Sequence, residues 1–390
     1  MEKRQLRGLE IVKKKGVKES EGGWLVKSES GRGYYRVSEE FACTCPDFEN
    51  HKAICKHSYA VRYFLQAETP QGIKIGRVRL TYPQAWSAYN AAQTSELTLF
   101  DELLKDLVKE IDEPTYTFGR PTLPLREQVF CSIQKVYSQL SSRRAVSLFG
   151  NAEKKGQIKQ VPNFNQVSTL LKNPETTALL MKLVTLSASP MKAVETEFAV
   201  DSTGFKTTCF TQYAEEKYKL GREHKWLKAH ACVGVKTNVV TSVEITEEYG
   251  ADCPQFPVLV QATANGGFQV KEVSADKAYL SRDNFEAVNA VGGQAYIPFK
   301  SNSTGKSDGS YLWRKAFFYF NEHAQEFYEH YHKRSNVEST FSAIKKKFGD
   351  TLKSKNKTAQ VNELLCKIIA HNIVVAIHEM HELGIAPKFI

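Results

Sequence analysis

The chain has 390 residues, with 53 Lys and Arg against 43 Asp and Glu, a net charge of +10 and a pI near 9.0. It is long enough for two or three domains with a buried core, and its positive charge favours a polyanionic partner. The most apolar stretch, residues 359–380, includes Glu363, Lys367 and two histidines. It is therefore predicted to be a buried core helix, and we expect no membrane partner.

The first residues, MEKRQLRGLEIVKKK, contain no apolar segment of signal-peptide type, and the chain has eight cysteines. We therefore expect a reducing, cytoplasmic compartment in which some cysteines bind metal instead of forming disulfides. Residues 1 to about 20 are rich in Lys and Arg. They are predicted to form either a solvated arm or one that contacts phosphates.

A small module is predicted from residue 22 to about residue 65. Its segments GGWLVKSES and GYYRVSEEF alternate like a short hairpin, and a short amphipathic helix follows the cysteines. Between them lie three cysteines and a histidine in a C-x-C, C-x-H pattern: Cys43, Cys45, Cys55 and His57. Four such ligands fill a tetrahedral Zn²⁺ and leave no open position, so the predicted site is structural and would hold the module together.

Two alternatives to this ligand set remain: His51 could replace one ligand, or the four residues could be unrelated members of a surface loop. The pattern resembles the SWIM-type zinc finger, a module that binds DNA or protein. The remaining cysteines are predicted to be buried small hydrophobic residues. They are Cys131, Cys209, Cys232, Cys253 and Cys366.

Residues 66 to about 190 are predicted to be mainly helical, with a joint at DEPTYTFGRPTLPLR, where three prolines prevent one long helix. Two short helices follow, with Ser142 and Asn163 as expected N-caps. They form either a helix-turn-helix that presents Arg143 and Arg144 to DNA or part of an ordinary helical bundle. We expect three domains, at residues 1–70, 71–190 and 191–390.

The third region is predicted to be α/β. Three strand-like runs come in succession and are followed by alternating helix and strand, which indicates a mixed sheet with helices packed on it. The strand-like runs are TEFAVDSTGF, KAHACVGVK, NVVTSVEIT, VKEVSADKAY and GQAYIPFK. The helix-like runs are CPQFPVLVQAT and SRDNFEAVNAVG, and the rest of the chain is predicted to be helical.

Two aspartates follow apolar strand-like runs. Asp201 ends TEFAVD and Asp276 ends VKEVSAD, so both are predicted at the carboxyl edge of the sheet, where α/β folds place their ligands. With Glu338 as a third carboxylate, they would suit a pair of Mg²⁺ ions, which prefer oxygen ligands. Two such ions can activate the attacking oxygen and stabilise the leaving one in a phosphodiester displacement.

The stretch YHKRSNVESTFSAIK contains four polar residues with helical spacing: Tyr331, Arg334, Glu338 and Lys345. At about 100° per residue, one α-helix would place all four on a single narrow stripe, beside an apolar flank that faces the core. By the helix rise, the first and last of them would lie roughly 10 Å from Glu338 on either side.

The strand-Asp, strand-Asp and helical Glu pattern, with Tyr-x2-Arg-x3-Glu-x6-Lys, resembles the DDE transposases of prokaryotic insertion sequences. The resemblance covers roughly residues 194–390 and implies an RNase H-like core, a prokaryotic source and a nucleoid-associated location. It implies that Asp201, Asp276 and Glu338 hold Mg²⁺ or Mn²⁺. It further implies that Tyr331, Arg334 and Lys345 contact DNA.

Three more features of the third region have open roles. Basic residues in GREHKWLKAH either contact DNA or lie in a solvated loop. Asp252 is either a fourth acidic group near the site or a helix N-cap, and Lys300 could reach a phosphate. Only 61 residues separate Asp276 from Glu338, so the chain lacks the large β-rich insertion that some related transposases carry there.

The function that we expect is that of a transposase, which binds the terminal inverted repeats of its element as a dimer, cuts them and joins the 3′-hydroxyl ends to target DNA. Two alternatives remain. One is a repair or recombination nuclease with the same core, which hydrolyses DNA without joining it. The other is a zinc-dependent DNA-binding regulator whose catalytic fold is inactive.

Overall fold

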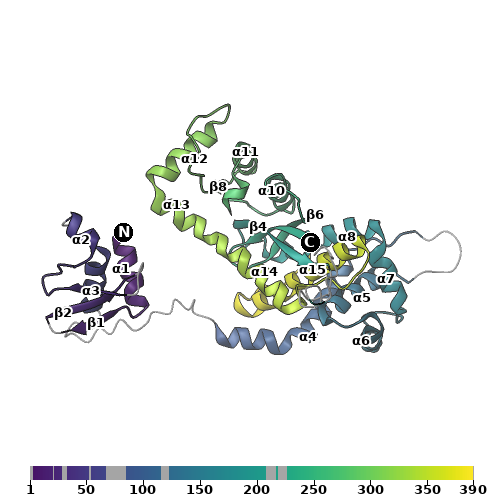
Figure 1. Ribbon diagram of the computed structural model, residues 1–390. Helices are drawn as coiled ribbons and strands as arrows, with labels where there is room; N and C mark the ends of the chain where they lie inside the picture. Colours follow the sequence, from purple (N-terminus) through teal and green to yellow (C-terminus); the bar gives the residue numbers. More distant parts are fainter. Residues whose placement is uncertain are drawn as a thin grey trace. The chain divides into compact units, whose positions relative to one another are not determined.

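The computed structural model describes residues 3–20, 22–28, 33–51, 54–66, 85–115, 123–207, 217 and 226–389 (Figure 1). The chain divides into two compact units, Met1–Gln84 and Ala85–Ile390, each with its own hydrophobic core. In the second unit, helices and strands on both sides of residue 190 contribute to one core. The expected domain boundary there stays a prediction.

The first unit contains a three-stranded antiparallel sheet in the order β1-β2-β3. Its elements are α1 (Lys3–Lys13), β1 (Val17–Ser20), β2 (Gly23–Lys27), β3 (Tyr34–Val37), α2 (Pro46–His51) and α3 (Lys56–Gln66). The predicted hairpin is confirmed as the β2–β3 pair, and the predicted helix after the cysteines as α3. Neither β1 nor α2 was expected.

The basic N-terminal segment is a helix that packs within the first unit, so the prediction of a solvated arm is wrong. A phosphate contact from its basic residues stays a prediction. Ile11 of α1 is buried in the core of this unit, and α1 packs against α3. The two helices come closest at Gly8, where a Cβ atom would lie 2.8 Å from the carbonyl oxygen of Lys56. Any larger side chain at this position would force them apart.

The second unit begins with five helices, which confirms the predicted helical region within the described residues. They are α4 (Trp86–Val108), α5 (Leu125–Ser138), α6 (Ser142–Lys154), α7 (Phe164–Lys172) and α8 (Pro174–Ala188). Asn163 caps α7 in a capping box with Gln166, as predicted for Asn163. The N-cap of α6 is Ser141 and not the predicted Ser142.

Helices α6 and α7 belong to a bundle. Residues 155–163 connect them, which is longer than the three- or four-residue turn of a helix-turn-helix. Both helices pack on α5, and α7 also packs on the C-terminal helix α15 (Lys357–Glu382). The bundle alternative is therefore favoured.

The sheet of the second unit has five strands in the order β6-β5-β4-β7-β8. Strand β5 is antiparallel to both of its neighbours, β4 and β6, whereas β4, β7 and β8 run parallel to one another. Each of the five predicted strands and both predicted helices are present. They are β4 (Glu197–Lys206), β5 (Trp226–Gly234), β6 (Val240–Glu247), β7 (Glu272–Ala275), β8 (Gln294–Tyr296), α10 (Gln255–Asn265) and α11 (Arg282–Ala290).

The chain ends in helices, and the longest of them is central to the core. They are α12 (Tyr311–Glu322), α13 (Ala324–Tyr331), α14 (Ser335–Phe348) and α15. Helix α15 packs against α4, α5, α7, α8 and β6 (Figure 1). By length and composition it could span a membrane, but 89% of its most apolar window is buried, as predicted for a core helix.

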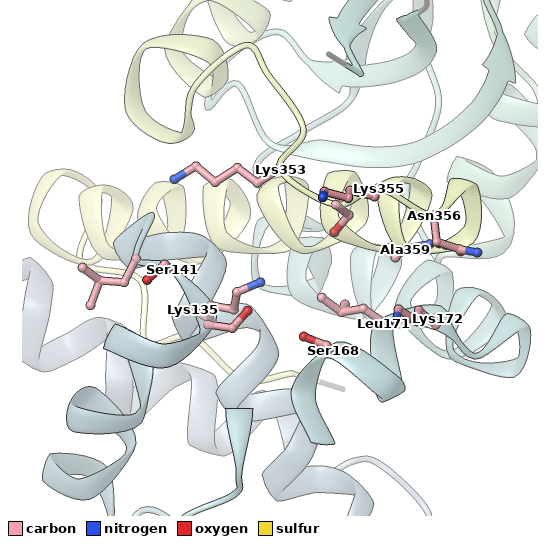
Figure 2. Close-up of a pocket in the computed structure, with 12 residues that line it drawn as sticks. Lys135, Ser141, Ser168, Leu171, Lys172, Lys353, Lys355, Asn356 and Ala359 are labelled. Carbon is pink, nitrogen blue, oxygen red and sulfur yellow. Dashed lines mark hydrogen bonds between the residues drawn. The ribbon is translucent and has the colours of Figure 1, made fainter. Parts of the chain in front are cut away.

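Several buried polar side chains of α15 form hydrogen bonds with backbone groups outside this helix. The Asn372 amide accepts from the Val240 N–H at 2.9 Å and donates to the Val240 carbonyl at 2.8 Å, at the edge strand β6. Glu363 accepts from two backbone N–H groups, and the Lys367 ammonium donates to two carbonyls. Beside the start of α15, helices α5 and α7 border a cavity of about 690 Å³ (Figure 2).

Replacing Asn372 with leucine should destabilise the second unit by about 1–3 kcal/mol, because the buried Val240 N–H and carbonyl would lose their partners. The free energy of unfolding from denaturant titration measures this loss. The matched control is Asn321→Leu, an exposed position whose change should stay within about 0.5 kcal/mol. Equal stability of the two variants would contradict the assigned role of Asn372.

The stability of the second unit should also depend on the pH through Glu379 of α15. Burial, and then the charge of Glu382, raise the pKa of Glu379 to about 7. Because the folded state favours the neutral carboxyl, this contribution to stability is fully present below the ordinary pKa of 4.5 and is lost as the pH rises through about 7.

We therefore expect the stability of Glu379→Gln minus that of the wild type to increase by about 2–3 kcal/mol when the pH rises from 5 to 9. Denaturant titrations at the two pH values measure this gain. The exposed Glu153→Gln is the control and should show no such trend. A constant difference between Glu379→Gln and the wild type would show that Glu379 titrates normally.

Candidate active site and metal centre

Asp201 and Asp276 occupy equivalent positions on two neighbouring parallel strands. Val200 of β4 pairs with Ala275 of β7, and the two aspartates are the next residues along each strand. Adjacent strands lie about 4.8 Å apart, so the two residues start from neighbouring backbone positions. Strand β4 continues to Lys206, so the prediction that Asp201 ends its strand is wrong, although β7 ends just before Asp276 as predicted.

Glu338 comes from α14, but the predicted single helix around it is wrong in detail. Helix α13 ends at Tyr331, residues His332–Arg334 form a 3-10 turn, and α14 starts at Ser335. The tighter turn changes the angular positions of Tyr331 and Arg334 relative to Glu338. The predicted apolar flank is confirmed, because four residues of α14 are buried: Val337, Phe341, Ile344 and Phe348.

Arg334 links two of the three carboxylates. Its guanidinium donates to Asp201 Oδ2 at 2.6 Å and to Glu338 Oε1 at 2.5 Å. The side chains of Arg334 and Asp201 are 19% and 20% exposed, whereas that of Glu338 is 58% exposed. The bridge therefore holds the more exposed carboxylate of Glu338 beside the sheet. A contact from Arg334 to a DNA phosphate stays a prediction.

The carboxylates crowd one another electrostatically. Burial raises the pKa of Asp201, the charges of Asp276 and Glu338 raise it further, and the Ser202 N–H and Arg334 oppose the shift. A site that gathers negative charge in this way favours a bound cation. Its donors are carboxylate oxygens, which are the ligands that Mg²⁺ and Mn²⁺ prefer, so their chemistry suits such ions. The three carboxylates are nevertheless not drawn together as closely as the cysteine and histidine ligands of the first unit. The Asp276 carboxylate also caps the following 3-10 turn by accepting from Ala278 N–H at 2.8 Å.

An open hollow of about 700 Å³ lies beside Asp201 and Glu338, and Lys345 lines it. The Lys345 ammonium donates to Thr203 Oγ1 at 2.6 Å and lies 5.3 Å from the centre of the Phe205 ring. Burial lowers the pKa of Lys345. The hollow is thus lined by acidic and basic groups together.

Tyr331, the first residue of the predicted stripe, is less directly connected to the carboxylates. Tyr331 is half-buried, with its ring 6.0 Å from that of Tyr328 and 6.4 Å from that of Phe327. Burial raises the pKa of its hydroxyl. Its DNA contact stays a prediction, as does that of Lys300, which is exposed just beyond β8.

Asp252 does not cap α10, so that expected role is wrong, whereas a role as a fourth acidic group near the site stays a prediction. Its carboxylate forms an ion pair with the Lys228 ammonium at 2.7 Å and lies 3.2 Å from His230 Nδ1, and the N-cap of α10 is Pro254. Lys228 and His230 are therefore engaged inside the fold, which excludes them as part of a solvated loop. The other basic residues of GREHKWLKAH lie outside the described residues.

Two further charged features of the site were not predicted from the sequence. Lys333 pairs with Glu197 at 2.7 Å and with Glu272 at 2.9 Å, and His330 lies 2.8 Å from Glu272. These contacts fasten the 3-10 turn before α14 to the start of β4 and β7. The second feature is Asp350, which lines the hollow and pairs with Lys206. No local pattern marks these residues, because their partners lie far away in the sequence.

The residues between β8 and α14 form no strand in the part of the chain that the structure describes, which agrees with the predicted lack of a β-rich insertion. They form α12 and α13, which carry a cluster of aromatic side chains. Its members include Trp313, Phe317, Phe320, Phe327 and Tyr328.

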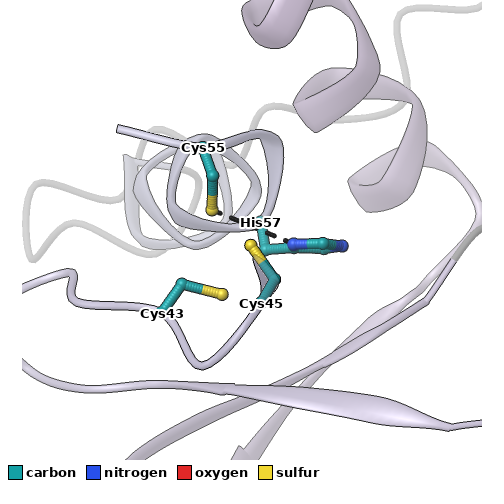
Figure 3. Close-up of side chains that lie close together, drawn as sticks. All are labelled: Cys43, Cys45, Cys55 and His57. Atoms are coloured by element: carbon teal, nitrogen blue, oxygen red, sulfur yellow. Dashed lines mark hydrogen bonds between the residues drawn. The ribbon is translucent and has the colours of Figure 1, made fainter. Parts of the chain in front are cut away.

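In the first unit, the four predicted metal ligands come together. One ligand atom of each lies within 4.8 Å of the others, and all four residues are buried (Figure 3). They are Cys43, Cys45, Cys55 and His57. The first two lie in the loop after β3, and the others at the start of α3. This is a Cys₃His group, which suggests a zinc finger.

The chemistry of these ligands fits Zn²⁺. His57 Nδ1 lies 3.9 Å from Cys55 Sγ, a separation expected for two ligands of one tetrahedral ion. The hydrogen bond from the Cys43 thiol lowers the pKa of Cys55 and raises that of Cys43. Each of the three cysteines would bind zinc as a thiolate. The His51 side chain lies outside the described residues.

The other cysteines are largely as predicted. Cys131, Cys232 and Cys366 are buried, Cys253 is half-buried, and Cys209 lies outside the described residues.

Residues 192–373 match the family model of the transposase DDE domain. This segment contains all three candidate carboxylates and is slightly less than half of the chain. No solved structure matches the chain. The family match supports a DDE transposase, whose substrate is DNA and whose catalysis uses divalent metal ions.

Removing the metal from the first unit should unfold that unit and leave the second unit folded, because the two cores are separate. We expect about one zinc per chain by elemental analysis, and Cys45→Ser should lower this content. Hydrogen exchange should then become fast in residues 3–66 and remain slow in α15. The control is Cys131→Ser, whose zinc content should match that of the wild type. Full exchange protection in a zinc-free chain would contradict a structural metal.

Proposed function

We propose that the chain is a DNA transposase, which cuts the ends of its insertion sequence and joins the freed 3′-hydroxyls to target DNA. One observation carries the proposal: Asp201 and Asp276 stand in register on parallel strands, and Arg334 joins Asp201 to Glu338. The family match over residues 192–373 supports the same activity.

We propose an RNase H-like core for the second unit. The sheet order β6-β5-β4-β7-β8 supports it, with three antiparallel strands followed by two parallel ones. In this arrangement β4 is central, with an antiparallel partner on one side and a parallel one on the other. Such a strand can present Asp201 beside the carboxyl end of β7, where Asp276 lies.

Asp201, Asp276 and Glu338 would hold the divalent ions. When bound, these ions would activate the attacking oxygen and stabilise the leaving oxygen of the phosphodiester. Arg334 orients Asp201 and Glu338 through its two hydrogen bonds. Lys345 lines the hollow beside them and would neutralise a phosphate of the DNA strand there.

The reaction has two displacements at phosphorus. Water first attacks a phosphodiester at the element end, and the P–O bond to the 3′-oxygen breaks to leave a free 3′-hydroxyl. That hydroxyl then attacks a target phosphodiester and releases a target 3′-hydroxyl, so the number of ester bonds is conserved in the joining step. No covalent link to a protein side chain is required.

Recognition of the element would use the rest of the chain. We propose that the first unit binds zinc as a SWIM-type finger and contributes to binding of the terminal inverted repeats. The helical region, to about residue 190, would add further contacts. Two ends must be processed together, which requires a dimer on DNA.

The decisive test compares carboxylate variants on DNA that carries the inverted repeats flanking the gene. Asp201→Asn and Glu338→Gln should lower Mg²⁺-dependent cutting by about a thousandfold, because several kcal/mol of transition-state stabilisation would be lost. The matched control is Asp350→Asn, a carboxylate in the same hollow that pairs with Lys206 and should retain cutting. Cutting by Glu338→Gln at the wild-type rate would refute the assignment.

A second assay separates a transposase from a nuclease with the same core. A pre-cut element end with a free 3′-hydroxyl is incubated with plasmid DNA and Mg²⁺. We expect covalent joining of the end to the plasmid. Hydrolysis without a joined product would favour the nuclease.

A further inference from the structure

A second hollow in the second unit, the lysine cavity, is strongly basic. It is the cavity of about 690 Å³ next to α5, α7 and the start of α15, and no Asp or Glu is among the described residues that line it. Four lysines line it together with serine hydroxyls and an asparagine (Figure 2). They are Lys135 of α5, Lys172 of α7, and Lys353 and Lys355 of the segment before α15.

Most of these ammonium groups are available to a ligand. Within the described part of the chain, those of Lys135, Lys172 and Lys355 have no hydrogen-bond or ion-pair partner. The Lys353 ammonium donates to the Gln139 carbonyl at 2.5 Å, which leaves two of its three N–H groups. Four positive charges around one cavity repel one another, and a bound anion would relieve this repulsion.

The segment that carries two of the lysines is held by buried charges of α15. Glu363 is 4% exposed and accepts from the backbone N–H groups of Lys353 and Ser354, at 2.9 and 2.8 Å. Lys367 is 2% exposed and donates to the carbonyls of Gly349 and Thr351, at 2.8 and 3.0 Å. Burying charges is costly unless they are fully bonded, so these side chains fix the segment. A fixed segment presents Lys353 and Lys355 at little entropic cost.

The lysine cavity is also close to the candidate active site along the chain. Asp350 lines the active-site hollow and Lys353 the lysine cavity, so at most about 11 Å of backbone separates them. Gln139 links Lys353 to the end of α14, because its side chain donates to the Lys347 carbonyl and its own carbonyl accepts from Lys353. Phosphates of one DNA strand recur every 3.4 Å along the duplex axis, so this span corresponds to about three nucleotides.

We propose that the lysine cavity binds the phosphodiester backbone of the DNA, a few nucleotides from the bond that is cut. The chemistry is that of phosphate recognition without base contacts: ammonium groups and hydroxyls, and no aromatic ring among the described residues that line the cavity. The cavity thereby sets the path of the strand through the active-site hollow. This proposal rests on the proposed function, because it takes DNA as the ligand.

The test measures DNA binding by the full-length, zinc-containing chain without Mg²⁺, so that no cutting occurs. The variant is Lys172→Gln with Lys355→Gln, two exposed positions on separate elements. Each phosphate contact contributes about one to the slope of log K against log salt, so the slope should fall by about two. Between 50 and 200 mM salt, the wild type should therefore lose about fifteen times more affinity than the variant.

The matched control replaces Lys154 and Lys182 with glutamine, which are exposed lysines of the same unit away from the cavity. It should keep the wild-type slope, and equal melting temperatures should show that all the proteins are folded. Arginine at positions 172 and 355 should restore the slope, because the charge returns. A wild-type slope in the glutamine variant would overturn the proposal.

The remaining outcomes separate this proposal from the proposed function. If the lysine variant loses its slope but the wild type never cuts DNA with Mg²⁺, the cavity binds DNA and the transposase activity is refuted. If the wild type cuts and the lysine variant binds normally, only the cavity proposal fails. Stabilisation of the wild type by inorganic phosphate, with unchanged DNA binding by the variant, would instead assign the cavity to a small anion and overturn the proposal.

Discussion

The parallel pairing of β4 with β7 is the constraint on which the candidate active site depends. It places Asp201 beside Asp276, and a slip of one residue in the register would turn one carboxylate to the opposite face of the sheet. Arg334, 133 residues from Asp201 in the sequence, then connects Glu338 of α14 to Asp201. Ion pairs from Lys333 to Glu197 and Glu272 hold the turn before α14 against the same two strands.

Helix α15 gives this sheet a rigid support. It packs against β6 and against four helices of the bundle, α4, α5, α7 and α8, so the sheet and the helical bundle share one core. Its buried Asn372 forms hydrogen bonds with the backbone of the edge strand β6. Glu363 and Lys367 form hydrogen bonds with the backbone of the segment between α14 and α15. Because these polar groups are paired with the backbone, they fix the relative positions of the active-site hollow and the lysine cavity.

The first unit has a different source of stability. Its described residues include a three-stranded sheet, three helices and a small core, and three of its buried core members are the cysteines of the Cys₃His group. A unit of this size buries too little apolar surface to be very stable by itself, so a metal there would contribute directly to folding. Helix α1 packs closely against α3 at Gly8, so the basic first residues form part of this packed unit.

The sequence alone predicted features that depend on neighbouring residues. The five strands, the buried helix α15 and the Cys and His spacing could all be predicted from local patterns, because hydrophobic period and ligand spacing act within one segment. Tertiary structure alone decided that Arg334 bridges Asp201 and Glu338, that Asp252 pairs with Lys228, and that four lysines line one cavity. These contacts join residues that are far apart in the chain. Their partners are selected by packing and by the cost of leaving a charge unpaired, and neither can be predicted from neighbouring residues in the sequence.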